Sequence, residues 1–174
     1  MKIAVLERNS VGTDIDVTCF EDFGEVTYYR NTVAADAAEK VKDVDIIIAN
    51  KAPMNEETLK DAPNVKLICE FATGFDNIDL EYCKKRRIKV ANVKDYSTAA
   101  VAQHTFALMF YVLHKLAYYD HYVKSGAYCT SAQFSHFEQK FSELDGKTWG
   151  IVGMGAIGKR VASHAQEFGC NFFF

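Results

Sequence analysis

Residues 148–158 read Thr148-Trp149-Gly150-Ile151-Val152-Gly153-Met154-Gly155-Ala156-Ile157-Gly158. A short apolar strand runs directly into a GxGxxG turn that opens a helix, which is the context that a dinucleotide-binding fingerprint requires. Gly153 permits the tight turn, Gly155 lets a pyrophosphate approach the backbone, and Gly158 lets the helix pack close to the strand. Free N–H groups at the start of the helix then hold the phosphates. The stretch predicts a cofactor-binding turn, against the alternative of a plain glycine-rich turn in an α/β fold. The predicted cofactor-binding residues are Gly153, Met154, Gly155, Ala156, Ile157 and Gly158.

The predicted helix 156–168 ends at Gly169, and Asn171 begins a second strand. The fingerprint places an acidic residue for the adenosine ribose about 20 positions further on. Only 16 residues follow Gly158, so the choice between NAD and NADP stays open. Because a complete dinucleotide-binding sheet has two halves and six strands, we expect the chain to be the N-terminal part of a longer protein.

The first 91 residues alternate short apolar runs, rich in Val and Ile, with helical patterns. The predicted strands are Lys2–Leu6, Glu25–Tyr29, Val44–Ala49, Val65–Cys69 and Ile88–Ala91. The predicted helices between them are Ala34–Lys42, Asn55–Asp61 and Asp79–Arg86. Each helix shows 3.6-residue spacing of apolar residues or a capping residue at its start. This alternation predicts an α/β domain with a parallel sheet that carries helices on both faces.

The pattern changes at Ser97, which is a suitable helix cap. The stretch 98–125 contains neither Gly nor Pro and carries two adjacent apolar stripes, which indicates burial against two neighbours. At 1.5 Å per residue the predicted helix would be about 42 Å long, enough to cross from one domain into another. Gly126 ends it, and the irregular, aromatic segment 128–144 is suited to an arm over a partner surface. We therefore divide the chain into domains 1–96 and 97–174, with a long crossing helix at 97–125.

Composition excludes several functional classes. Lys and Arg total 20 against 23 Asp and Glu, a net charge of −3 that argues against a nucleic-acid groove. No apolar run is long enough to cross a membrane, and the N-terminus lacks the apolar core of a signal peptide. The five cysteines are scattered and never spaced as CxxC, so they predict neither a zinc site nor a disulfide framework. We expect a cytoplasmic protein with no metal, no nucleic-acid partner and no membrane contact.

Three ordered motifs carry a family resemblance. They are Ala72-Thr73-Gly74-Phe75-Asp76-Asn77-Ile78-Asp79, then Tyr96-Ser97-Thr98-Ala99-Ala100-Val101-Ala102-Gln103-His104-Thr105, then the glycine turn ending at Gly158. In this order the chain resembles the D-isomer-specific 2-hydroxyacid dehydrogenases over its whole length. The motifs Ala49-Asn50-Lys51-Ala52-Pro53 and Gln103-His104 are most similar to the glycerate dehydrogenase, or hydroxypyruvate reductase, branch.

The resemblance implies a flavodoxin-like substrate domain followed by the start of a Rossmann NAD-binding domain, with the active site between them. It implies that backbone N–H groups at Thr73 and Gly74 hold the substrate carboxylate, with Thr73 also facing the cofactor. The alternative for this loop is a glycine-centred turn capped by Asp79. Tyr96 matches a substrate-contacting position, against a role in hinge packing, and Val101 matches a position near the nicotinamide, against a role in the core. Lys51, at the end of another predicted strand, would attract an anionic substrate, against a plain surface lysine.

The function that the resemblance implies is an NAD-dependent oxidoreductase acting on the CH–OH group of D-2-hydroxy acids such as glycerate, as a homodimer at full length. The family's catalytic Arg, Glu and His belong to a later region, so we predict no catalytic residue in this chain and no activity from it alone. We expect its five histidines to be structural or solvent-facing: His104, His114, His121, His136 and His164. The alternative is a non-catalytic fragment or assembly partner of a full-length dehydrogenase. A receiver-like domain is disfavoured, because Glu7-Arg8 breaks the acidic pair it needs.

Overall fold

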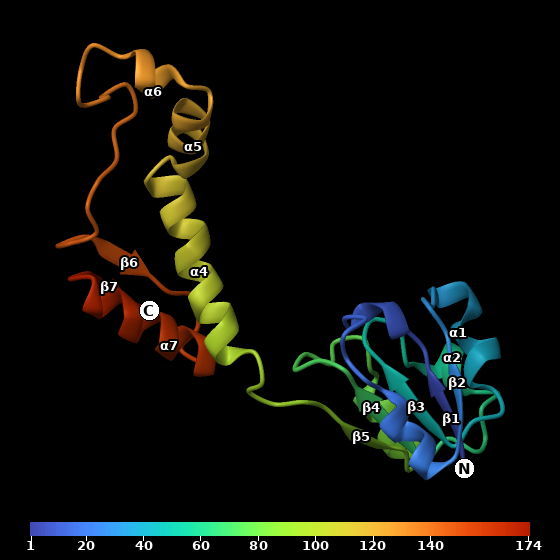
Figure 1. Ribbon diagram of the computed structural model, residues 1–174. Helices are drawn as coiled ribbons and strands as arrows, with labels where there is room; N and C mark the ends of the chain where they lie inside the picture. The colour runs from blue at the N-terminus through green and yellow to red at the C-terminus, as the bar shows by residue number, and fades with distance from the viewer. The chain divides into compact units, whose positions relative to one another are not determined.

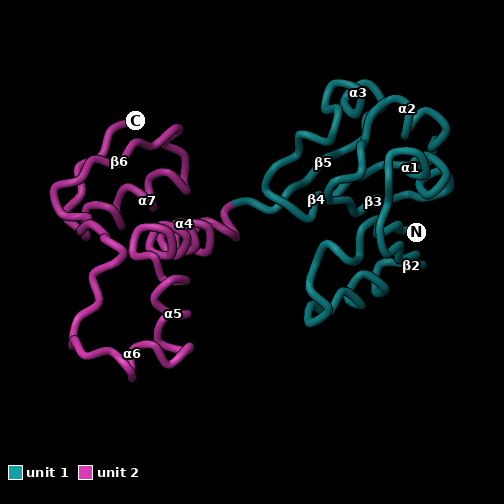
Figure 2. Tube along the Cα trace, turned by 90° about the horizontal axis from the view of Figure 1, so that it is seen from above, with its two compact units in different colours: residues 1–94 teal, residues 95–174 magenta.

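A computed structural model describes residues 1–174, which divide into two compact units, residues 1–94 and residues 95–174 (Figure 2). The division falls two residues before the boundary that we placed from the sequence. Each unit has its own sheet and its own apolar core.

Unit 1 is built on a five-stranded parallel sheet in the order β2-β1-β3-β4-β5. The strands are β1 (Lys2–Val5), β2 (Glu25–Tyr28), β3 (Ile46–Ala49), β4 (Leu67–Glu70) and β5 (Lys89–Ala91). The order 2-1-3-4-5 is the flavodoxin-like one, which confirms the predicted fold class. Ile47 lies at the centre of the sheet, paired with Ala4 of β1 and Ile68 of β4. Central parallel strands are apolar on both faces, which is why the three central strands β1, β3 and β4 stand out in the sequence as apolar runs.

Three helices cover one face of this sheet: α1 (Ala34–Val41), α2 (Glu56–Leu59) and α3 (Leu80–Lys85) (Figures 1 and 2). Asn55 caps α2 by accepting the Thr58 N–H, and Asp79 caps α3 by accepting the Tyr82 N–H. A cap of this kind satisfies one of the N–H groups that a helix start leaves free. The core beneath the helices contains Leu6, Ile47, Met54, Leu59 and Ile68, all fully buried.

Our prediction of helices on both faces of this sheet was wrong. Right-handed crossovers carry α1, α2 and α3 to the same face. The β1–β2 connection covers the other face, and it forms two short 3-10 helices, η1 (Arg8–Ser10) and η2 (Thr18–Phe23). An apolar groove of about 500 Å³ remains on that side, lined by Phe20, Ile48, Cys69 and Phe71 among others.

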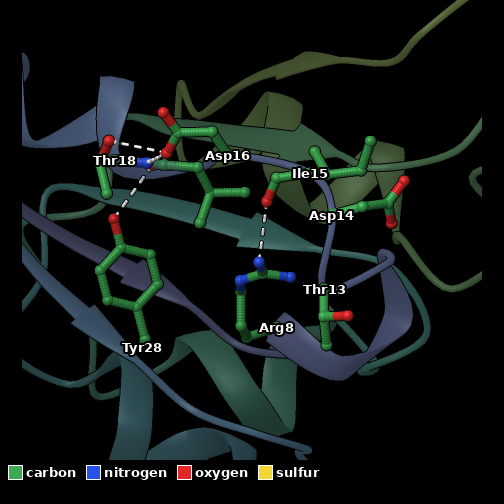
Figure 3. A pocket seen from close by; sticks show the side chains of 8 residues that line it. Arg8, Thr13, Asp14, Ile15, Asp16, Thr18 and Tyr28 are labelled. Atoms are coloured by element: carbon green, nitrogen blue, oxygen red, sulfur yellow. Dashed lines mark hydrogen bonds between the residues drawn. The ribbon is translucent and has the colours of Figure 1, made fainter.

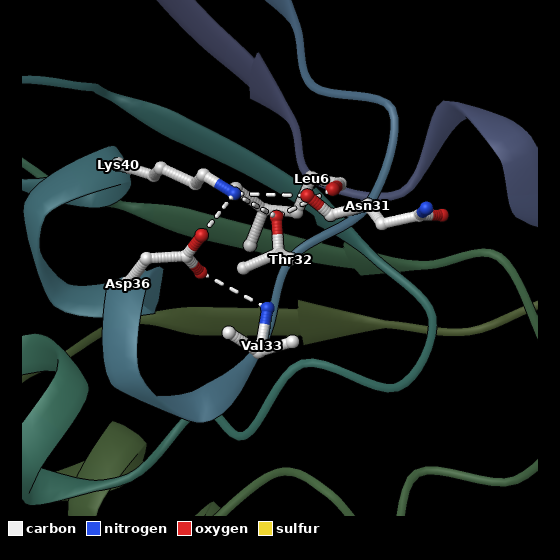
Figure 4. A network of polar contacts seen from close by, with 6 residues as sticks. All are labelled: Leu6, Asn31, Thr32, Val33, Asp36 and Lys40. Carbon is white, nitrogen blue, oxygen red and sulfur yellow. Dashed lines mark hydrogen bonds and ion pairs between the residues drawn. The ribbon is translucent and has the colours of Figure 1, made fainter.

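A polar network fixes the start of α1 to the end of β1 (Figure 4). The Lys40 ammonium contacts the Asp36 carboxylate at 2.7 Å and donates to the Asn31 carbonyl at 2.9 Å. Asp36 also accepts the backbone N–H of Val33 at 2.9 Å, and the Thr32 hydroxyl donates to the Leu6 carbonyl. Lys40, followed by the backbone contact, lowers the pKa of Asp36. The network is structural, because each of its polar groups is used within the fold.

Unit 2 pairs β6 (Thr148–Gly150) with β7 (Asn171–Phe173) in parallel, and α7 (Ala156–Glu167) connects them. Its core forms where α4 (Thr98–Leu113) packs on α7. Phe106 lies at the centre, with its ring 4.8 Å from that of Trp149 and 5.5 Å from that of Phe168. β6 has one neighbouring strand, and Val152, which follows β6, is fully exposed. The open edge of a strand such as β6 is able to accept another strand.

The predicted helix 97–125 is not continuous. Its range is divided between α4 and α5 (Leu116–Lys124), and a further short helix, α6 (Ala127–Thr130), follows Gly126. Lys115 has φ 55°, in the left-handed region. A residue in that conformation ends an α-helix, and neither Gly nor Pro marks the position. Here the ring of His114 stacks on that of Phe141, with centroids 4.7 Å apart, so a contact 27 positions away in sequence accompanies the break.

None of the helices combines the length and the apolar character that crossing a membrane requires.

Candidate active site

The carboxyl edge of the unit 1 sheet brings together three of the residues singled out from the sequence. Lys51 follows the end of β3, and Thr73 and Gly74 follow the end of β4, the neighbouring strand. Ligands of open α/β sheets bind outside the carboxyl ends of the strands. The topology therefore places all three at the edge where a ligand is expected.

The loop that carries Thr73 and Gly74 is fixed by hydrogen bonds to the segment after β5, and the backbone N–H groups of these two residues stay free. The Thr73 hydroxyl donates to the Val93 carbonyl at 2.8 Å, and the Asn92 amide donates to the Thr73 carbonyl at 2.8 Å. The backbone N–H groups of Thr73 and Gly74 make no hydrogen bond within the protein, and both residues are exposed. A side chain on Gly74 would meet only Asp76, at an ordinary 3.7 Å. Two adjacent free donors on a fixed loop suit a carboxylate ligand.

Glu7 anchors the segment that carries Lys51. Glu7 follows β1 and is buried, and its carboxylate accepts backbone N–H groups from Asn50 at 2.6 Å, Lys51 at 2.8 Å and Ala52 at 3.2 Å. The Lys51 side chain is exposed. The backbone of Lys51 is therefore fixed, while its ammonium group stays at the surface.

Glu70, the last residue of β4, is a second buried carboxyl at this edge. One oxygen, Oε2, accepts the Asn77 amide at 3.2 Å, and the other, Oε1, has no hydrogen-bond partner within the protein. Burial raises the pKa of Glu70 to about 7, with the nearby Glu7 carboxylate adding to the effect and the Asn77 amide and Lys51 opposing it. A buried carboxyl without full pairing favours its neutral form.

Tyr96 and Val101 belong to unit 2. Tyr96 precedes α4 and is exposed, and Val101, in the first turn of α4, is also exposed. Ser97 occupies the N-cap position of α4, but its side chain makes no capping hydrogen bond. Neither Tyr96 nor Val101 belongs to the core of unit 2.

The glycine turn between β6 and α7 leaves open space beside the start of α7. Gly153 has φ 96°, in the region that favours glycine. A Cβ on Gly158 would collide with the Gly153 carbonyl oxygen, whereas a Cβ on Gly155 would meet nothing within 4 Å. Gly158 is therefore required by helix–strand packing, and Gly155 leaves open space for a ligand. The helix start at Gly155 has no side-chain cap and no acidic residue in its first turn, so its N–H groups are available to an anion. These residues fit a dinucleotide.

The five histidines occupy ordinary surroundings. His104 and His121 are exposed, and the rings of His114, His136 and His164 pack on Phe141, Tyr122 and Phe106 respectively. No group of three or more His, Cys, Asp or Glu side chains is placed to hold a metal ion.

A further pocket, of about 410 Å³, lies beside the loop that follows η1 (Figure 3). Several of its polar groups are engaged within the fold. The Arg8 guanidinium donates to the Ile15 carbonyl at 2.8 Å, Asp16 accepts the backbone N–H and hydroxyl of Thr18, and the Tyr28 hydroxyl donates to the Val17 carbonyl. These contacts hold the loop closed on itself, which is a structural role.

The reading of the sequence missed Glu7, Glu70 and Asn77 as members of this site. The predicted strands end at Leu6 and Cys69, so Glu7 and Glu70 were both expected in loops, as was Asn77. Polar residues are common in loops after strands, so none of the three stood out. Their partners lie 43 or more positions away for Glu7 and as far as 25 for Asn77.

The chain is an α/β protein in which a flavodoxin-like sheet is followed by a strand, a GxGxxG turn and a helix. The sequence model of the D-isomer-specific 2-hydroxyacid dehydrogenase catalytic domain matches residues 3–165. The chain belongs to the D-isomer-specific 2-hydroxyacid dehydrogenase family.

Named relatives agree with this membership. The chain is 33% identical to a hydroxypyruvate reductase of Blautia hydrogenotrophica, over 97% of the chain and 54% of that protein. It is 34% identical to a glycerate dehydrogenase of Methylorubrum extorquens, over 97% of the chain and 53% of that protein. The structure of a D-lactate dehydrogenase from Aquifex aeolicus, complexed with NAD and lactic acid, matches with a TM-score of 0.79 at 30% identity, covering 99% of this chain and 50% of that one. The chain thus spans about half the length of these relatives.

Proposed function

We propose that this chain forms the substrate-binding unit and the first part of the nucleotide-binding unit of an NAD-dependent oxidoreductase that acts on D-2-hydroxy acids of the glycerate and hydroxypyruvate type. The observation that carries the proposal is the pair of free N–H groups at Thr73 and Gly74, fixed at the carboxyl edge of a parallel sheet. The names of the relatives support the substrate class.

Residues from both units contribute to binding of the substrate and the cofactor in this proposal. The N–H groups of Thr73 and Gly74 orient the substrate carboxylate, and the Lys51 ammonium attracts it. Tyr96 contacts the substrate, and Val101 packs near the nicotinamide. Thr73 also faces the cofactor.

Residues 153–158 hold the pyrophosphate through the free N–H groups of α7. A bound nicotinamide supplies the hydride chemistry, while the protein supplies position and electrostatics. We propose NAD as the cofactor, with NADP as the outcome to be distinguished. No catalytic acid or base is assigned to residues 1–174, and we expect no turnover from these residues alone.

Backbone amide NMR on the 174-residue chain tests the proposal. D-glycerate and hydroxypyruvate should shift the amides of Thr73 and Gly74, and NADH should shift those of Gly155 and Ala156, with binding weaker than micromolar. Acetate, which lacks the 2-hydroxy group, is the matched control for the acid. NADPH run in parallel distinguishes the cofactors. If neither acid perturbs unit 1 more than acetate does, the substrate assignment is wrong, and measurable hydroxypyruvate reduction by the chain alone would refute the expected inactivity.

The exposed apolar surface of unit 2 favours a second candidate, an assembly role. Leu108 and Val112 on α4 are exposed, and Phe134 in the following segment is 90% exposed. Exposed apolar patches of this kind mark interaction surfaces. We infer that this surface pairs with a second copy of the chain, as a homodimer, or with an intact subunit. Sedimentation velocity of the wild type against Val112→Asp tests this: a dimer lost in the variant supports it, and a monomer at every concentration contradicts it.

We also infer a cytoplasmic location. All five cysteines are free thiols, and two of them, Cys19 and Cys129, are exposed. Free exposed thiols persist where the compartment is reducing.

A further inference from the structure

Two buried carboxyl groups lie at the same sheet edge as the proposed substrate loop, and they differ in their hydrogen-bond partners. Glu7 is 8% exposed and accepts three backbone N–H groups. Glu70 is 2% exposed, accepts one amide N–H at Oε2 and leaves Oε1 without a partner within the protein. An unpaired buried carboxyl oxygen is costly, and the cost is greatest when the group is charged. The position of Glu70 at the end of β4 does not explain why an ionisable side chain with an unpaired oxygen is buried there.

Asn77 connects Glu70 to both parts of the site. Its amide nitrogen donates to the Glu70 carboxyl at 3.2 Å and to the Ala52 carbonyl at 3.0 Å. Its backbone carbonyl accepts the Met54 N–H at 2.8 Å. The Asp79 N–H also donates to the Met54 carbonyl, at 2.9 Å, so one side chain and two backbone hydrogen bonds attach the loop that contains Thr73 and Gly74 to the segment that follows Lys51.

The groups around Glu70 act on its pKa in opposite directions. The charged groups that act on it are Glu7, from the end of β1, and Lys51, from the end of β3, and the Asn77 amide faces it from its own loop. Burial and Glu7 favour the neutral acid, whereas Asn77 and Lys51 favour the carboxylate. The resulting pKa of about 7 means that the group changes charge within the physiological range.

We propose that Glu70 is a positioning residue: it ties the Asn77 loop to the segment that follows Lys51, and once ionised it competes with the substrate carboxylate for the Lys51 ammonium. The inference rests on the proposed function. On ionisation the proton passes to water, and no other group changes. Because an anionic substrate adds a third negative charge beside Glu7 and Glu70, its binding takes up a proton at Glu70, and the affinity for the acid falls as the pH rises through neutrality.

The first arm of the test needs no ligand. NMR of the 174-residue chain from pH 5 to pH 9 follows the Glu70 side-chain carbonyl carbon, the Asn77 side-chain amide and the Gly74 backbone amide. We expect all three to titrate with one midpoint near pH 7. In Glu70→Gln, which keeps an acceptor for Asn77 and cannot ionise, the Asn77 and Gly74 transitions should vanish. The control Glu57→Gln makes the same change at an exposed site in α2 and should keep both. If Glu70 titrates near its ordinary value, or if Gly74 does not follow it, the inference is wrong, and the wild type alone decides this even if Glu70→Gln fails to fold.

The second arm measures D-glycerate affinity at pH 6 and pH 8.5. If binding requires the neutral form, the dissociation constant of the wild type should rise about tenfold or more over this range. In Glu70→Gln it should stay nearly constant. Binding that is equally tight at both pH values overturns the inference and leaves the proposed function standing. Absence of D-glycerate binding at either pH, with the three groups still titrating together, refutes the proposed substrate and supports the coupling of Glu70 to the loop.

Discussion

The carbonyl oxygen of Gly153 lies where a side chain on Gly158 would begin. The first and last glycines of the turn are therefore fixed against one another by the close approach of α7 to the end of β6. The middle glycine, Gly155, is different, because the space beside it is open. Glycine is thus required at position 158 by close packing, whereas at position 155 it leaves space beside the helix start.

Gly158→Ala should destabilise unit 2, because its methyl group forces α7 away from the strand. Overpacking of this kind costs about 1–3 kcal/mol. Urea unfolding followed by the fluorescence of Trp149, the chain's single tryptophan, measures the effect. Unchanged stability would show that α7 does not approach β6 as closely as described.

Gly155→Ala is the matched variant for the ligand. Because Gly155 has φ −72° and open space beside it, alanine fits without strain, and the variant should lose only the N-cap difference between glycine and alanine, about 1 kcal/mol or less. It should nevertheless weaken NADH binding, read from energy transfer between Trp149 and the nicotinamide, since the added methyl occupies the space that the pyrophosphate would use. Equal NADH binding in the variant and the wild type would place the cofactor elsewhere.

Glu70→Gln should change how stability depends on pH. The folded pKa is raised from 4.5 to about 7, so below pH 4.5 the proton is bound in both states and the group contributes nothing. Between these values the unfolded state ionises first, and wild-type stability falls until about pH 7. Glu70→Gln should therefore match the wild type near pH 4 and exceed it by about 3 kcal/mol at pH 8. Urea unfolding at the two pH values tests this, and a difference that is the same at both contradicts it.

Glu7→Gln should destabilise unit 1, because a neutral amide oxygen is a weaker acceptor than Oε2, the carboxylate oxygen that accepts all three N–H groups, and the amide nitrogen would face the Lys51 N–H. The expected loss is about 1–3 kcal/mol. Glu39→Gln, on the exposed surface of α1, is the control and should change stability by less than about 0.5 kcal/mol. Hydrogen exchange at Asn50, Lys51 and Ala52 should accelerate in Glu7→Gln alone, and protection retained at all three would rule out the anchoring role.

Lys115→Gly should stabilise the chain, because glycine adopts φ 55° without the steric cost that a side chain meets there. The gain expected is about 1 kcal/mol. Lys159→Gly, inside α7, is the matched control and should lose about 1 kcal/mol. If both variants lose stability, Lys115 lies within a continuous helix, as the sequence suggested.

Some of these structural features could be predicted from the sequence and others could not. Patterns confined to a few neighbouring residues were predictive: apolar strands such as Ile46–Ala49, the caps Asn55 and Asp79, and the glycine turn all rest on local chemistry. The break at Lys115 was not predictable, because no local signal marks it and the His114–Phe141 stacking joins distant segments. The single-sided helix cover of the unit 1 sheet also escaped prediction, since alternation along the chain does not specify whether the β1–β2 connection forms an α-helix.

Short-range periodicity and turn chemistry encode the parallel α/β architecture, the place of the glycine turn and the loop that contains Thr73 and Gly74, so these features could be predicted from the sequence. The anchoring of Lys51 by Glu7 and the contact of Glu70 with the loop through Asn77 arise only in the folded chain. The crossovers between parallel strands bring the ends of β1, β3 and β4 to one edge, and the contacts of Glu7 there join residues more than 40 positions apart. Burial and charge at that edge are properties of the assembled sheet, so no single stretch of sequence contains them.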